Sequence, residues 1–217
     1  NSYSGWSGWF VENSYSPTLT ENATYKIQIK CKDLVGNESD VATSPSFVLD
    51  TVAPDTPSPT TKTPTNDTTP TWNWNPIAGV VSYGVRIDNN SETIQTATSY
   101  TSSNLTLGNH TIYVRAKDSS GNWSSYGTHT VLIDTTAPAV PSPSTTTPTQ
   151  NQTITWSWSA IDGAVTYRLK LDGVSKGDNN ATSYTVNNLS EGNHTFEVAS
   201  IDSAGNVSAF GNHTVTI

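Results

Sequence analysis

Short runs of alternating apolar and polar residues recur along the chain, with the period of two that is typical of strands buried on one face. In the run 154–158, the side chains of Ile154, Trp156 and Trp158 share one face and Thr and Ser lie between them. Further runs of this kind lie at 167–171, 194–198 and 215–217. Turn-forming Asp-Gly and Gly-Asn pairs separate the runs, and no window of comparable length has helical spacing. The pattern predicts an all-β chain of antiparallel β-sandwiches.

An internal repeat sets the domain organisation. The segment VLDTVAPDTPSP at 48–59 recurs as LIDTTAPAVPSP at 132–143, so Pro54 corresponds to Pro138 with a period of 138 − 54 = 84 residues. The same offset aligns the rest of the two copies without a gap. An earlier segment, KCKDLVGNES, matches only the later part of the repeat. We therefore predict tandem sandwiches with an incomplete module at 1–53 and complete modules at 54–137 and 138–217.

A family resemblance follows from the order of the repeated residues. Trp158, Tyr167, a Leu189-x-x-Gly192 turn and the Asp202-x-x-Gly205-Asn206 loop resemble fibronectin type III modules and related bacterial Ig-like repeats of secreted or cell-surface proteins. The resemblance implies that Trp158, and Trp74 in the preceding module, are core tryptophans of the second strand. It implies a fold far more firmly than it implies a function.

The same family has a tyrosine corner, in which a Tyr six residues after a Leu hydrogen-bonds the backbone. Leu19 and Tyr25 fit this spacing in the incomplete module. In the complete modules His110 and His194 stand at the corresponding position, and we expect their imidazoles to replace the hydrogen bond of the tyrosine.

Composition and charge exclude some classes of partner. The chain of 217 residues has 10 Lys and Arg against 18 Asp and Glu, a net charge of −8. Nucleic-acid binding requires a surplus of basic residues, so no nucleic-acid partner is expected. No stretch approaches the roughly 20 apolar residues of a membrane helix, so this segment is not expected to insert into a membrane.

No catalytic residue and no cofactor is predicted. The four histidines are two positions that each occur in both modules, and a structural role explains such repetition better than catalysis. Cys31 alternates with Ile27 and Ile29, which predicts an inward-facing, inert core thiol.

Calcium at the module junctions is one candidate for a metal site. Asp50 and Asp134 each precede Thr-x-Ala-Pro at a junction, where Asp33 or Asp118 is the further carboxylate expected to reach in from a loop. Ca²⁺ takes six to eight oxygen ligands, and these carboxylates are few. In the alternative interpretation the Asp side chains cap turns by accepting backbone N–H bonds.

Tryptophans and asparagines supply the remaining candidate sites. The paired tryptophans of each module are expected in the core rather than in a sugar-stacking platform, whereas Trp123 and Trp9 are candidate ligand contacts. Asn-x-Ser/Thr motifs mark candidate glycosylation sites; those selected are Asn22, Asn66, Asn104, Asn122, Asn180 and Asn206.

These observations favour a non-catalytic spacer, stalk or adhesin segment that is secreted or displayed at a cell surface. Its expected partners are other modules of the same or neighbouring chains, with surface glycans or a host or cell-surface protein as further candidates. One alternative is a carbohydrate-binding or accessory spacer region of a secreted polysaccharide-degrading enzyme. Another is a subunit of an extracellular filament, in which a neighbour's strands complete the half module; a cut within a longer repeat array is the simpler explanation of that half module.

Overall fold

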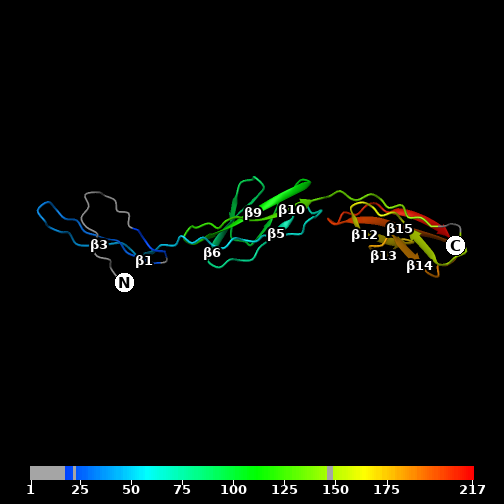
Figure 1. Ribbon diagram of the computed structural model, residues 1–217, viewed down its shortest axis with the longest axis horizontal. Helices are drawn as coiled ribbons and strands as arrows, with labels where there is room; N and C mark the ends of the chain where they lie inside the picture. Colours follow the sequence, from blue (N-terminus) through cyan, green and yellow to red (C-terminus); the bar gives the residue numbers. More distant parts are fainter. Residues whose placement is uncertain (1–17, 22, 146–148) are drawn as a thin grey trace. The chain divides into compact units, whose positions relative to one another are not determined.

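The computed structural model describes residues 18–21, 23–145 and 149–217 (Figure 1). Every regular element in these residues is a strand, as predicted, and all named strand pairs are antiparallel. Within these ranges no helix is long and apolar enough to cross a membrane. The chain divides into two compact units: residues 1–53 with 120–122, and residues 54–119 with 123–217.

The first unit contains two short strand pairs. Its strands are β1 (Thr24–Tyr25), β2 (Gln28–Ile29), β3 (Ala42–Thr43) and β4 (Phe47–Val48), with β1 paired to β4 and β2 to β3. The Tyr25 hydroxyl donates to the Thr20 carbonyl at 2.9 Å, which forms the expected tyrosine corner.

The prediction of a buried Cys31 is wrong, because the thiol is exposed. Ile27 and Ile29, which alternate with it, are also exposed, at 49% and 59%. Their counterparts in the next module, Ile112 and Val114, are fully buried. Alternation assigned these side chains to one face, but among the described residues of this unit no opposing sheet covers that face.

Each complete module has its own core between a four-stranded and a two-stranded sheet. The first consists of β5 (Thr71–Asn73), β6 (Val80–Ile87), β7 (Thr93–Gln95), β8 (Ser99–Thr101), β9 (Gly108–Asp118) and β10 (Gly127–Ile133). Its sheets have the orders β10-β9-β6-β7 and β5-β8. Trp72 and Trp74 are buried against Ile112, Val114 and Val131.

The second complete module repeats this topology. It consists of β11 (Ile154–Ser157), β12 (Ala164–Leu171), β13 (Val174–Asn179), β14 (Ser183–Val186), β15 (Asn193–Asp202) and β16 (Gly211–Thr216). The sheets have the orders β13-β12-β15-β16 and β11-β14. Trp156 stacks on Phe196 with 5.0 Å between ring centroids, and Trp158 contacts Tyr167 edge-on at 5.3 Å. The core role predicted for the paired tryptophans is thus confirmed.

Candidate functional site

The linker before each complete module continues into the proline-rich start of that module, and this proline-rich segment packs so closely on the module's final strand that only glycine fits there. A Cβ atom added to Gly127, at the start of β10, would lie 1.6 Å from the Pro57 carbonyl oxygen. The repeat is faithful, since a Cβ on Gly211 would lie 1.7 Å from the carbonyl oxygen of Pro141. The proline-rich segments are therefore docked along the modules.

An asparagine in the Asp-x-x-Gly-Asn loop holds the second of these linkers. Gly205 has φ of 102°, a left-handed conformation that favours glycine, and the turn brings Asn206 back toward the linker. The Asn206 side-chain amide, 7% exposed, donates to the Asp134 carbonyl at 2.8 Å and to the Asp202 carboxylate at 2.9 Å. We call this loop-to-linker contact the asparagine clasp.

Residue Asp134 is bonded on three sides. Its N–H donates to the Thr65 carbonyl at 2.9 Å, its carbonyl accepts the clasp, and its carboxylate accepts the N–H of Thr136 at 2.9 Å. Thr65 precedes this linker and Asn206 follows it, so hydrogen bonds from both complete modules converge on one linker residue.

The preceding linker has an equivalent clasp. The Asn122 side-chain amide donates to the Asp50 carbonyl at 3.1 Å, and the Ser120 hydroxyl donates to the Asp50 carboxylate at 2.9 Å. Neither clasp was predicted from the sequence, although the signal was present: the Asn of the Gly-Asn pair stands 72 residues after the linker Asp in each module (122 − 50 = 206 − 134 = 72).

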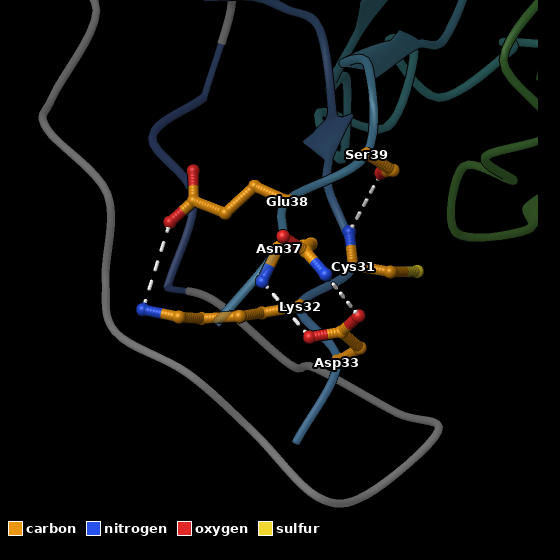
Figure 2. Close-up of a pocket in the computed structure, with 6 residues that line it drawn as sticks. All are labelled: Cys31, Lys32, Asp33, Asn37, Glu38 and Ser39. Atoms are coloured by element: carbon orange, nitrogen blue, oxygen red, sulfur yellow. Dashed lines mark hydrogen bonds and ion pairs between the residues drawn. The ribbon is translucent and has the colours of Figure 1, made fainter. Parts of the chain in front are cut away.

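The first unit shows the same loop at its own Asp33 (Figure 2). There the Asp33 carboxylate accepts the backbone N–H of Asn37 at 2.8 Å and its side-chain amide at 2.7 Å. Cys31, Lys32, Glu38 and Ser39 complete an open hollow around it, where Lys32 faces Glu38 (Figure 2).

Hydrogen bonding keeps the loop carboxylates ionised. The side-chain and backbone hydrogen bonds of Asn37 lower the pKa of Asp33. At Asp202 burial acts to raise the pKa, but the hydrogen bonds from Asn206 and Gly205 outweigh burial and lower it. A carboxylate that accepts several N–H bonds is stabilised in its charged form.

Two of the three residues predicted to bind calcium, Asp50 and Asp134, lie at the linkers and cap turns there. Asp134 accepts the N–H of Thr136, and Asp50 accepts that of Val52 at 3.1 Å. Asp118 ends β9. No group of three or more His, Cys, Asp or Glu side chains suited to a metal ion occurs in the described residues. Calcium binding stays a prediction.

The expected histidine corners are present in both complete modules. His110 Nε2 lies 3.0 Å from the Thr106 carbonyl and Nδ1 lies 2.7 Å from Asp88, while His194 makes equivalent contacts with Ser190 at 3.0 Å and Asp172 at 2.8 Å. Both ring nitrogens of His194 face acceptors, which favours the imidazolium. Accordingly, the hydrogen bond to Asp172 raises the pKa of His194 against the effect of burial.

The other candidate positions differ in accessibility. Trp123 is half-buried and Trp9 lies outside the described residues. Of the sequon asparagines, Asn66, Asn104 and Asn180 are exposed and Asn122 is half-buried, while Asn22 lies outside the described residues. Asn206 is buried, and glycosylation there would require its amide nitrogen to leave the clasp. The sequon alone does not distinguish these environments.

No family model and no curated protein matches the chain. Among solved structures, it is similar to the fibronectin(III)-like modules of CbhA from Clostridium thermocellum, with 16% identity over 76% of this chain and 90% of that one, at a TM-score of 0.49. It is also similar to the FN1–FN3 domains of chicken CNTN1, with 16% identity over 92% of this chain and 78% of that one, at a TM-score of 0.50. At this identity the likeness to the CNTN1 domains shows the fold alone: the chain is built of fibronectin type III-like β-sandwiches.

Proposed function

We propose that this chain is a non-catalytic spacer or display segment of a secreted or cell-surface protein, in which ordered linkers hold fibronectin type III-like modules at defined separations. The carrying observation is the asparagine clasp, because it occurs at both linkers with equivalent residues. Asn206 bonds the Asp134 carbonyl and Asn122 bonds the Asp50 carbonyl. Linkers that served only as flexible tethers would not need such contacts.

Burial adds a physical reason for the clasp. A linker carbonyl is ordinarily hydrated and free to reorient, whereas the Asp134 carbonyl accepts a bond from a side chain that is itself buried. Breaking that bond leaves a buried amide without one of its acceptors, which is costly. The proline-rich docking at Gly127 and Gly211 acts in the same direction, since it fixes the chain immediately after each clasp.

His110 and His194, the histidines considered as catalytic candidates, both have structural hydrogen-bond partners. The imidazoles of His110 and His194 close corners by bonding a backbone carbonyl and an Asp side chain in each module. A residue that serves the same corner in both modules supports a role in the fold.

Backbone ¹⁵N relaxation of the whole chain tests the proposal. For residues 134–137 we expect order parameters near 0.85, like those of strands β12 and β15, whereas a flexible tether would give values below about 0.6. Flexible linkers in the wild-type chain would refute the spacer proposal. Asn206→Ala should lower the values at 134–137 and leave those inside β12 unchanged, while Asn180→Ala, at an exposed position, serves as the control.

A further inference from the structure

The outer face of the sheet β10-β9-β6-β7 carries an alternating stack of aromatic rings and guanidinium groups. The Arg115 guanidinium lies 4.2 Å from the centre of the Trp123 ring and 5.1 Å from that of Tyr126. The Arg86 guanidinium lies 5.3 Å from Tyr126 and 3.8 Å from Tyr113. We call these five residues the Arg–aromatic ladder. Their distances are those of cation–π contacts.

One glycine and one carboxylate fix this ladder. Glu92 bonds Arg115 with two contacts, at 2.7 and 2.9 Å, and accepts the hydroxyl of Tyr126. The carboxylate crosses β6 at Gly84, where an added Cβ would lie 2.6 Å from it. Burial acts to raise the pKa of Glu92, but the hydrogen bonds from Arg115 and Tyr126 outweigh it and lower that pKa. The ladder is therefore ordered before any ligand arrives.

The other complete module shows that the fold does not require this ladder. At the offset of 84 residues, Tyr113, Arg115 and Trp123 correspond to Glu197, Ala199 and Val207. The inward positions of β9 and β15 nevertheless keep the same character, with Val114 and Val198 both fully buried. Arg86 and Tyr126 correspond to Lys170 and Phe210, which keep one cation–ring contact at 4.1 Å. Since the two copies share their topology, the full ladder with Tyr113, Arg115 and Trp123 is an addition to one sheet face rather than a condition of the sandwich.

The charge of the ladder opposes that of the chain. The Arg115 guanidinium is paired with the Glu92 carboxylate, and Arg86 and Lys117, whose ammonium lies 5.4 Å from the Trp123 ring, add two further cations beside the rings. The whole chain carries −8. Charges beyond about 8 Å are largely screened at physiological ionic strength, so a ligand at this face meets mainly the local positive charge.

We propose that the Arg–aromatic ladder binds a polysaccharide that carries carboxylate groups. Flat rings supply apolar area at little conformational cost, which suits the apolar faces of sugar rings. Guanidinium groups donate charge-assisted hydrogen bonds to carboxylates. Arg115 holds Glu92 through Nε and Nη2, so a ligand carboxylate would accept from the remaining N–H groups of Arg115 and Arg86. This binding function goes beyond the spacer function and does not depend on it.

Calorimetric titration of the whole chain with short oligogalacturonates, in buffer with chelator, tests the proposal. Fully methyl-esterified oligomers serve as the uncharged control and poly-glutamate as an anion without sugar rings. We expect binding only to the oligogalacturonates, weakened by salt. No binding, or equal binding to either control polymer, would overturn the proposal.

Variants then assign the binding to the ladder. Trp123→Val, which copies the other module, and the double variant R86A/R115A should each weaken binding by at least about tenfold. The matched control is K170A/F210A, which removes the corresponding cation–ring contact at 4.1 Å from the other module and should change affinity less than about twofold. A cooperative thermal transition in each variant establishes folding. Binding that survives both ladder variants, or is lost in the control, would contradict the assignment.

Discussion

Replacing Asn206 by Ala removes the clasp and leaves the rest of the loop in place. Two hydrogen bonds are lost, one to the neutral Asp134 carbonyl and one to the ionised Asp202 carboxylate. A neutral bond contributes about 1 kcal/mol and a bond to a charged group about 1.5–3 kcal/mol. Because Asp202 is only half-buried, water solvates its carboxylate once the hydrogen bond is removed and offsets part of that loss. We expect a total destabilisation of about 2 kcal/mol.

For a module of this size, 1 kcal/mol corresponds to about 4–8 °C in Tm. The transition of residues 138–217 should therefore fall by roughly 8–16 °C in differential scanning calorimetry. Asn206→Asp should destabilise the module more than Asn206→Ala at neutral pH. The new carboxylate faces two hydrogen-bond acceptors, and its negative charge repels that of Asp202. Acidification that protonates the new carboxylate should reduce this excess cost.

The control is Asn180→Ala, at an exposed position, which should remain within about 0.5 kcal/mol of the wild type. The reasoning would be refuted if Asn206→Ala were equally mild. It would also be refuted if Asn206→Asp were as stable as Asn206→Ala at neutral pH.

Three further predictions concern the core, a corner and the thiol. Trp156→Ala, which removes a fully buried ring stacked on Phe196, should cost about 3–5 kcal/mol in chemical denaturation; a cost below about 1 kcal/mol would contradict its core role. The hydrogen bond to Asp172 that raises the pKa of His194 stabilises the module in full below about pH 6.5. This stabilisation is lost as pH rises through the folded pKa. Burial acts to raise the pKa of Asp172, but the His194 hydrogen bond and others outweigh it, so that contribution is lost as acid protonates Asp172 below about pH 4. The Asp172 side chain is 44% exposed, so the His194–Asp172 pair contributes less than about 1 kcal/mol to the stability of the module. His194→Ala should flatten the decline in Tm between pH 6 and 9. An unchanged decline would contradict the assignment of this decline to His194. Cys31 should react with a thiol reagent without denaturant, and protection until unfolding would show that its face is covered.

Most of the fold could be predicted from the alternation of apolar and polar residues and from the 84-residue repeat. The period of two placed Trp156 and Leu169 inward, and both are buried, because a strand covered on one face must sort its residues in this way. The histidine corners were also predictable, since His110 and His194 stand where a bonded residue is needed near the start of the late strand. These features depend either on residues that are close in the sequence or on positions that are repeated in the second module.

What escaped prediction depends on pairs distant in the sequence. The Arg–aromatic ladder requires the register that sets Arg86 beside Tyr113, and a route for Glu92 across Gly84. Neither is visible in a one-strand pattern. The prediction that Cys31 is buried failed for a related reason. Alternation shows which side of a strand a residue faces, but burial requires a second sheet over that side.

The spacer proposal depends on whether the clasped linker fixes the separation of its two modules, and a distance distribution measures this directly. Spin labels at exposed positions Asn104 and Asn180, introduced as cysteines in a Cys31→Ser background, allow pulsed dipolar spectroscopy on the whole chain. We predict one narrow distribution for the wild-type linker and a broader one after Asn206→Ala. A wild-type distribution that is as broad as that of the Asn206→Ala variant would contradict the account.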